Sequence, residues 1–396
     1  MKTALHSDKH RKGLSESTNA ILMVSPALVV IFGLAVYPLL CTIWYSLSDV
    51  DLLKGESTFL GLKNYLTVLS STDFWNSIGI TLYFTVVSLL VQLPLGILIA
   101  LLLNQEFHGR WLLRSIILIP WAVPTLVNAT LWDWIYNVNY GALNRILLQL
   151  HFIEKPIIWL DTPIKAMNMI VLADTWKVLP LYVIMILASL QTIDKTRMES
   201  AIIDGAGVFR RFISIVLPLI KPMIMVILVI RTMQALKVFD MVYMLTHGGP
   251  ANGTMVVSYF IYNQTFSYMK FGYGAAIAVL VAIVSILITL IYVRVLRSED
   301  LYLSSIISDA SLKSFAIYFA AIVVFLWTVL PLAWMFISSI TPSVDLLVTK
   351  GKWISSHLTF SRYASIFSSA DASSAGAVFF HSIKNSIFVS VLTMLF

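Results

Sequence analysis

Six ionisable side chains fall inside long apolar stretches of the sequence, where a charge is costly and therefore marks a candidate functional position. They are Asp133, Asp174, Lys177, Arg231, Lys237 and Asp240. In one stretch, a helix would place four residues on one face, at positions i, i+3, i+4 and i+7: Arg231, Gln234, Ala235 and Val238. That face mixes hydrogen-bonding groups with small and apolar ones, as the wall of a cavity for a hydroxylated ligand would. We expect Arg231, Gln234 and Val238 to line a solute pathway, and pairing within a helix bundle is the alternative.

An aromatic and a basic residue stand side by side in another apolar stretch. Trp176 offers a flat ring and Lys177 a hydrogen-bond donor, a combination that suits a sugar ring, so we expect both along the same pathway. The alternative interpretation is that Trp176 packs against lipid and that Lys177 extends its ammonium group to the membrane surface. Lys237 and Asp240 are three residues apart, a spacing at which they could pair with each other.

The sequence predicts neither a catalytic centre nor a metal site. The seven His residues are scattered without the spacing of metal ligands, and no nucleophile elbow or paired carboxylates indicate an enzyme. The sequence contains no phosphate-binding loop of the Gly-x-x-x-x-Gly-Lys-Ser/Thr type, so any ATP hydrolysis must occur in another polypeptide. The single cysteine, Cys41, excludes a disulfide framework within one chain. We expect no cofactor.

Composition places these residues in a membrane. The chain has 396 residues, of which 59% are hydrophobic and 12% charged, about half the charged fraction of ordinary soluble proteins. Its mean hydropathy is +0.86. In a soluble protein the net charge of +7 would suggest nucleic acid, whereas here Lys and Arg in loops that face anionic lipid explain it. The sequence predicts an all-α, polytopic transmembrane helical bundle in contact with membrane lipid, without a nucleic-acid partner.

Eight stretches approach the length of about 20 apolar residues that a helix needs to cross the hydrocarbon core. The predicted spans are 20–41, 77–103, 112–136, 167–190, 219–242, 273–296, 315–340 and one that begins near 383. Basic residues gather in the N-terminal segment 1–19 and after the second, fourth and sixth spans, which predicts a cytoplasmic N-terminus. Pro94, Pro120 and Pro124 suggest kinked helices, although membrane helices also tolerate Pro without a special role.

The loop of residues 194–218, between the fourth and fifth spans, is long and patterned. Thr196 and Glu199 have capping-box spacing, so a short helix should begin at Thr196. Gly205 can take the left-handed conformation that ends a helix. A second amphipathic turn follows, in which Arg210 and Arg211 are polar and these residues are apolar: Phe209, Phe212, Ile213 and Val216. On periodicity alone, a helix that lies on the membrane surface is an equal alternative.

The string Glu199-Ser200-Ala201, followed by Gly205 and by Ile215-Val216-Leu217-Pro218, resembles the coupling motif of binding-protein-dependent ABC importer permeases. Ser200 replaces the alanine usual in that family, one small residue for another. The resemblance implies a helix that docks in a cleft of an ATP-binding cassette ATPase subunit and moves two spans together when the ATPase dimer closes. The positions that it assigns to ATPase coupling are Glu199, Ser200, Ala201, Asp204, Gly205 and Ala206.

Further motifs resemble carbohydrate-type permeases of the MalF-like and glycerol-3-phosphate-permease-like kind. They are the strings at 176–180, 239–240, 245–254 and 271–276. The resemblance covers roughly residues 20–297 and implies a six-span, type I importer permease of the inner membrane. It also implies a sugar or sugar-related solute, delivered by an extracytoplasmic solute-binding protein. An ion-coupled secondary transporter of a polar solute is the alternative, but it leaves the loop at 194–218 unexplained. A membrane-embedded enzyme is a third class, which no motif supports.

About a hundred residues follow the predicted core of 20–297. Residues 298–314 are the expected cytoplasmic linker, and residues 315–396 resemble the opening of a MalG-like partner, a second permease half. The resemblance rests on Trp327 to Pro331, Trp334, Tyr363 and Asn385-Ser386, among others. The sequence therefore predicts two permease halves fused in one chain, with the second half cut off inside its next helix. Either the native product continues beyond Phe396 or the chain is a truncated product.

Overall fold

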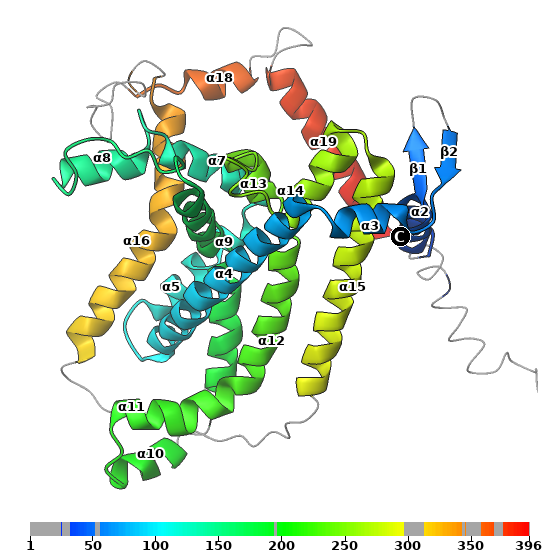
Figure 1. Ribbon diagram of the computed structural model, residues 1–396. Coiled ribbons are helices and arrows are strands. Elements are labelled where there is room, and N and C mark those ends of the chain that lie inside the picture. Colours follow the sequence, from blue (N-terminus) through cyan, green and yellow to red (C-terminus); the bar gives the residue numbers. More distant parts are fainter. Residues whose placement is uncertain are drawn as a thin grey trace, which may run out of the picture. The chain divides into compact units, whose positions relative to one another are not determined.

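The predicted all-α architecture is confirmed by the computed structural model, in which most described residues are helical (Figure 1). The described residues are 25, 32–51, 56–193, 196–296, 313–342, 345, 358–367 and 375–395. The predicted N-terminal segment 1–19, most of the linker 298–314 and part of the first predicted span lie outside them. The chain forms two compact units, Met1–Phe74 with Ile261–Leu287, and Trp75–Phe260 with Ile288–Phe396.

The first unit contains the only strands among the described residues, and the sequence patterns had not predicted them. Strand β1 (Ser48–Asp51) pairs antiparallel with β2 (Glu56–Phe59). The side chain of Asn64 donates hydrogen bonds to the carbonyls of Ser46 and Ser48 and so ties this hairpin to its neighbours. The helical elements of the unit are η1 (Phe32–Val36), α2 (Tyr37–Ser46), α3 (Lys63–Leu69), η3 (Asn263–Ser267) and most of α15 (Phe271–Leu296).

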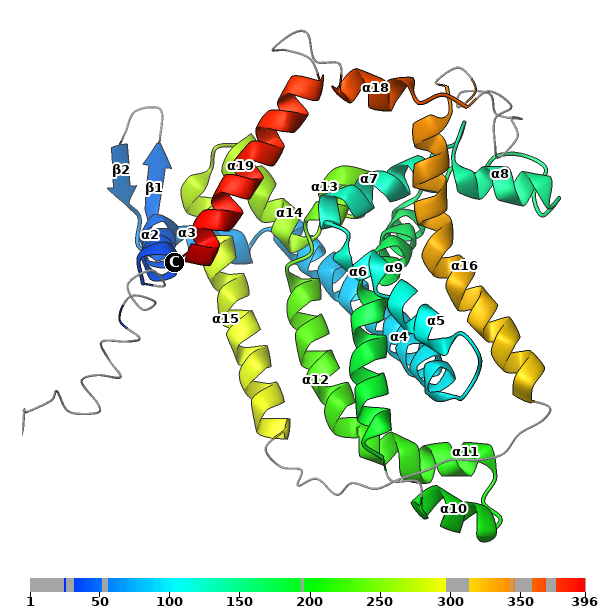
Figure 2. The same cartoon turned by 180° about the vertical axis from the view of Figure 1, so that it is seen from behind.

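The second unit is a bundle with short helices at its two ends. Its long helices are α4 (Thr72–Asn104, all but the first turn), α9 (Pro163–Gln191), α12 (Leu217–Leu236), α16 (Lys313–Ile340) and α19 (Ala375–Leu395). Its shorter elements are α5 (Arg110–Ile116), α6 (Ile119–Ala122), α7 (Thr125–Tyr136), α8 (Ala142–Gln149), α10 (Thr196–Ile203), α11 (Val208–Arg211), η2 (Phe212–Val216), α13 (Asp240–Leu245), α14 (Val257–Tyr262) and α18 (Ser361–Phe367). Figures 1 and 2 agree that α8 lies at one end of the bundle and α10 with α11 at the other.

Five helices of the described chain are long and apolar enough to cross a membrane. They are Thr72–Asn104, Pro163–Gln191, Val208–Leu236, Phe271–Tyr292 and Tyr318–Ile340. The predicted span 112–136 is instead two helices, Arg110–Ala122 and Thr125–Tyr136, bent by 97°. Pro124 stands at the break, because it has no N–H to continue the first helix.

Two predicted boundaries were wrong. The fifth span was expected to run to residue 242, but α12 ends at Leu236, and a separate helix, α13, begins at Asp240. Val238 and Phe239 in this gap are apolar, and apolar residues predominate on both sides of it, so hydropathy alone did not indicate the break. The helix expected to begin near residue 383 begins at Ala375.

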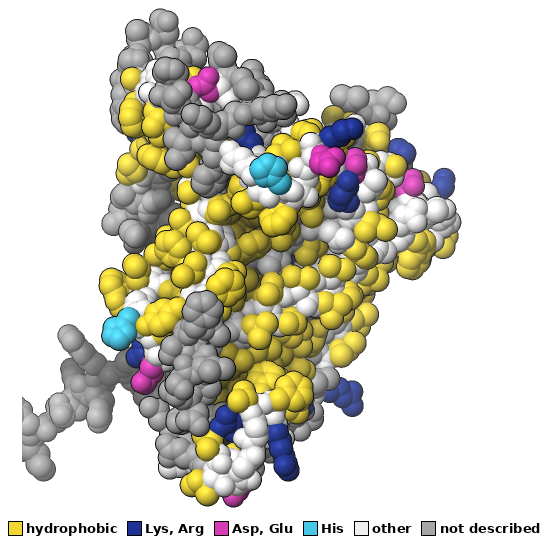
Figure 3. All heavy atoms as spheres, turned by 90° about the vertical axis from the view of Figure 1, so that its left-hand side faces the viewer, with side chains coloured by type: hydrophobic (Ala, Val, Ile, Leu, Met, Phe, Trp, Pro, Cys, Tyr) yellow, Lys and Arg dark blue, Asp and Glu magenta, His cyan; other side chains and the backbone are white. Residues whose placement is uncertain are grey.

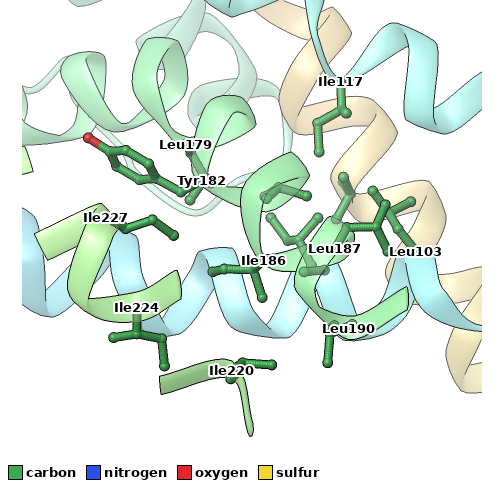
Figure 4. Close-up of a cluster of buried hydrophobic side chains, with 14 of the residues drawn as sticks. Leu103, Ile117, Leu179, Tyr182, Ile186, Leu187, Leu190, Ile220, Ile224 and Ile227 are labelled. Carbon is green, nitrogen blue, oxygen red and sulfur yellow. The ribbon is translucent and has the colours of Figure 1, made fainter. Parts of the chain in front are cut away.

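An apolar cluster holds the second unit together. Its central residues come from α4, α9 and α12, and Figure 4 shows them interdigitated. Leu103, Tyr182, Ile186, Ile220 and Ile227 are almost fully buried. In a bilayer the lipid tails are as apolar as these side chains, so close packing rather than escape from water stabilises the contact. On the face drawn in Figure 3, hydrophobic side chains form a broad band, and most charged ones gather toward its ends.

The glycine-rich segment 245–254 is closed by its own hydrogen bonds and by close approaches. Thr254 Oγ1 donates to the carbonyl of Gly249 and lies 2.7 Å from Thr246 Oγ1. Gly253 sits directly against the ring of Pro163, the first residue of α9, and leaves no room for a β-carbon.

Replacing Gly253 with alanine should therefore force Pro163 to move. We expect the free energy of unfolding to fall by about 1–3 kcal/mol, the usual cost of overpacking, and thermal unfolding in detergent would measure it. Gly79→Ala is the matched control, because a β-carbon at Gly79 meets nothing within 4 Å. Equal melting temperatures for the two variants would contradict the close approach at Pro163.

Candidate functional site

A cavity of about 260 Å³ lies in the second unit. Helices α6, α7, α9, α12 and α13 and the α12–α13 connection supply its lining residues: Trp121, Thr125, Asp174, Lys177, Val178, Arg231, Gln234, Lys237, Val238, Phe239, Asp240 and Met241. Four of the five residues predicted to line a solute pathway are among them, namely Lys177, Arg231, Gln234 and Val238. The cavity therefore brings together residues that the sequence separates by more than one helix.

A buried ion pair forms part of the cavity wall. Arg231 Nη2 lies 2.6 Å from Asp174 Oδ2, and the two residues are only 2% and 7% exposed. Gln92 of α4 donates from Nε2 to Asp174 Oδ2 at 2.9 Å and to Thr175 Oγ1 at 3.1 Å. The guanidinium carbon of Arg231 lies 5.3 Å from the centre of the Phe84 ring, within cation–π range. Arg231 thus pairs within the bundle and also lines the cavity.

Gln234 is held one helical turn along α12 from Arg231. Tyr182 donates its hydroxyl hydrogen to Gln234 Oε1 at 3.1 Å. The carbonyl oxygen of this amide is engaged once, and its NH₂ group offers N–H donors to a ligand. Gln234 is exposed, in contrast to Arg231, and can meet a hydroxylated solute without loss of a buried contact.

Three further charged groups line the same cavity: Lys177, Lys237 and Asp240. Within the described part of the chain, no ion pair joins Lys237 to Asp240, contrary to the pairing that their spacing suggested. The spacing rule holds on one continuous helix, whereas Lys237 caps the end of α12 and Asp240 begins α13. These charges remain available to groups that enter the cavity.

Trp176, the fifth predicted pathway residue, lies away from the cavity lining. Its side chain is 1% exposed, and its indole Nε1 donates to the backbone carbonyl of Trp327 in α16 at 3.0 Å. The sequence could not indicate this direction, because neighbouring residues of a helix point about 100° apart and α9 is covered on several sides.

Gln92 and Tyr182 were not among the predicted site residues, and Asp174 was named as a candidate functional charge but not as a pathway residue. Asp174 and Arg231 carry opposite charges in two predicted spans, and that signal could have suggested their pairing. Gln92 and Tyr182 gave no comparable signal, since each is a single polar group in a long apolar stretch.

The loop between α9 and α12 contains the short helix that the capping-box spacing predicted. Helix α10 begins at Thr196, and Gly205 ends it with a φ of 72°. The backbone N–H of Gly205 donates to the carbonyl of Ile202, and that of Ala206 donates to Ala201. This is the Schellman arrangement of a helix terminus. The side chain of Glu199 lies outside the described part of the structure.

The far end of this loop exposes apolar side chains. Ile203, Val208 and Phe209 are largely exposed, as are Ser200, Asp204 and Gly205. Arg210 is exposed but Arg211 is buried, so the two arginines do not share the polar face that the sequence pattern indicated. Figures 1 and 2 show α10 and α11 together at one end of the bundle, beyond the last turn of α9 and the first turn of α12.

Comparison with known sequences gives consistent matches. Residues 92–299 match the family described as binding-protein-dependent transport system inner membrane component. The chain is 43% identical over 282 residues to the trehalose/maltose transport system permease protein MalF of Thermococcus litoralis. The match covers 71% of this chain and 95% of the relative. It is 36% identical over 288 residues to the sulfoquinovosyl glycerol transport system permease protein SmoG of Agrobacterium fabrum. This match covers 72% of this chain and 93% of the relative.

Two solved structures share the fold. One is a bacterial alginate ABC transporter in complex with an alginate pentasaccharide-bound periplasmic protein, with a TM-score of 0.60 over 70% of this chain and 93% of the matched chain. The other is a bacterial ABC transporter involved in the import of alginate, with a TM-score of 0.62 over 71% of this chain and 96% of the matched chain. Both are 23% identical in sequence and therefore establish the fold alone.

Proposed function

This chain belongs to the family of binding-protein-dependent transport system inner membrane components, and from that premise we propose that it imports a sugar or sugar-related solute. Its relatives are named as permeases, so the chain is a transport component rather than an enzyme. In this proposal ATP hydrolysis in separate ATPase subunits drives alternating access of the cavity between α9 and α12. Family membership does not favour an ion-coupled secondary transporter.

One observation carries the proposal. The loop with α10 and α11 joins the two helices that hold Asp174 and Arg231 at the cavity. A force applied to α10 and α11 would therefore act directly on both sides of the ion pair. The stiff, capped end of α10 suits it to transmit such a force, because a Schellman terminus fixes the direction of the chain.

A sugar-type solute suits both the cavity and the named relatives. The lining offers Arg231, Gln234 and Lys177 as donors, Asp240 as an acceptor, and the rings of Trp121 and Phe239. Hydroxyl groups can bind the polar members, and the aromatic rings can pack against the apolar face of a sugar. The relatives' names refer to trehalose, maltose and sulfoquinovosyl glycerol.

The proposed partners are ATP-binding cassette ATPase subunits, an extracytoplasmic solute-binding protein and a second permease half. Residues 20–297 would form the first half, with the coupling loop at 194–218 on the cytoplasmic side and the N-terminus on that same side. Residues 315–396 would begin the second half, fused to the first through the linker 298–314. In the ATPase contact we assign roles to Glu199, Ser200, Ala201, Asp204, Gly205 and Ala206.

An exposed phenylalanine at the tip of the coupling loop provides a test. Phe209 is 76% exposed, and apolar anchors of this kind commonly dominate a protein interface. We expect Phe209→Asp to weaken retention of the ATPase subunit by roughly a factor of 30 or more, equivalent to about 2 kcal/mol. Co-purification of the ATPase encoded beside this chain would measure it.

Phe152→Asp is the matched control. Phe152 is 73% exposed, close to the value for Phe209, but it follows α8 at the opposite end of the bundle. The ATPase should remain bound to this variant. If both variants kept the ATPase, or both lost it, the loop would not be the docking element.

A further inference from the structure

Helix α16 packs one of its faces against other helices of the second unit. Apart from Ile340 at its end, the buried residues described in α16 recur every three or four positions: Ala321, Val324, Thr328, Pro331, Trp334 and Ser338. Large apolar residues such as Phe319, Ile322 and Phe336 are exposed on its other side. The helix therefore has a protein-facing stripe and a lipid-facing stripe, and its protein-facing stripe lies against α5 and α7.

Pro331 leaves a backbone carbonyl without a donor in the middle of the protein-facing stripe. In an α-helix the N–H of residue 331 would donate to the carbonyl of residue 327. Proline has no N–H, so the helix cannot supply the regular hydrogen bond to the Trp327 carbonyl. Inside a bilayer there is little water to replace the missing donor, and a neighbouring protein group must do so.

Trp176 supplies the missing donor. Its indole Nε1 lies 3.0 Å from the oxygen of Trp327, the carbonyl that Pro331 frees. The ring of Trp132 stands 6.3 Å from the Trp176 ring and 6.3 Å from the Trp327 ring, so the three indoles form one cluster. The Trp132 Nε1, although buried, has no hydrogen-bond partner among the described residues. Of the Trp132 and Trp176 indoles, only Trp176 donates a hydrogen bond to the Trp327 carbonyl.

Contacts near both ends of α16 fix its direction. At one end the Tyr318 ring meets Phe107 edge-on, and its hydroxyl accepts the backbone N–H of His108. At the other end the Arg145 guanidinium lies 5.6 Å from the centre of the Trp334 ring. The Trp176 hydrogen bond lies between these ends, so it sets the position of α16 along its own axis.

We propose that the surface around Trp132 and Trp176 is a docking site for a proline-containing membrane helix, and that Trp176 recognises the helix through the carbonyl that its proline frees. In this chain the occupant is α16. In a helix without proline that carbonyl already accepts an intrahelical N–H and offers the Trp176 indole only its second lone pair, so the site favours a proline-containing helix. Trp176 also stands between Asp174 and Lys177 on α9, so docking ties the cavity wall to the segment that follows the core.

Cutting the chain between the core and α16 would measure the strength of docking. A protease site is inserted in residues 298–312, the purified full chain is cleaved, and the retained fraction of the C-terminal fragment is followed on dilution. We expect Trp176→Phe to raise the dissociation constant roughly fivefold, the factor expected for one buried hydrogen bond. Trp132→Phe removes the same ring area without removing a hydrogen bond, so it should raise the dissociation constant less. Equal effects of the two substitutions would overturn the proposal.

A second substitution isolates the role of proline. Pro331→Ala restores an N–H that can donate to the Trp327 carbonyl, so Trp176→Phe in that background should cause little further loss. A Trp176→Phe effect of the same size in both backgrounds would also overturn the proposal. Hydrogen exchange of ¹⁵N-labelled indole groups tests the same hydrogen bond without a substitution at Pro331. The Trp176 indole N–H should exchange more slowly than the Trp132 indole N–H. The reverse order would contradict the hydrogen bond.

Discussion

An Arg231→Ala variant is expected to lose at least about nine-tenths of solute uptake and to unfold more easily, while it still binds the ATPase. The substitution leaves the carboxylate of Asp174 buried beside Gln92 without its cation. Removing one partner of a buried ion pair typically costs about 3–5 kcal/mol of stability. Loss of a hydrogen bond between a charged group and the solute would reduce uptake by roughly tenfold or more.

The measurement combines uptake with thermal unfolding. Radiolabelled trehalose and maltose serve as probes, in cells that express the chain with the ATPase and solute-binding protein encoded beside it. The double variant Asp174→Asn/Arg231→Gln removes both charges and keeps hydrogen-bonding groups, so stability should largely return while uptake stays low. Normal uptake with unchanged preference between the two probes in the double variant would remove Arg231 from the proposed pathway.

A Glu199→Lys variant should abolish ATP-driven uptake and leave the chain inserted in the membrane. The expectation follows from the position of Glu199 in α10, within the loop that joins α9 to α12. Reversing a charge at a docking surface brings like charges together at a cost of several kcal/mol, enough to weaken ATPase binding by about a hundredfold or more. Uptake and ATPase co-purification should fall together.

Glu106→Lys is the control for this charge reversal. Glu106 is an exposed acidic residue in the loop between α4 and α5, outside the proposed ATPase contact. Uptake by that variant should remain close to the unsubstituted level. Normal uptake by Glu199→Lys, or an equal loss in both variants, would argue against a specific docking role for the coupling loop.

Several features of this protein were determined by the sequence alone, because they depend on local chemistry. Long apolar stretches must form helices in lipid, where every backbone amide needs a partner within the same segment. The start of α10 at Thr196 followed from capping-box spacing, and its end at Gly205 followed from the ease with which glycine takes a positive φ. The carbohydrate-permease resemblance, which the family match and the similarity to sugar permeases confirm, also came from contiguous motifs.

Only the tertiary structure decided which of the polar residues meet. Asp174 and Arg231 are 57 positions apart, and each could have faced lipid, solvent or another helix. Trp176 and Lys177 are neighbours, yet Lys177 lines the cavity and Trp176 bonds to α16. The reason is physical: a helix distributes its side chains around its axis, and the packing of other helices alone selects which direction is cavity, core or lipid.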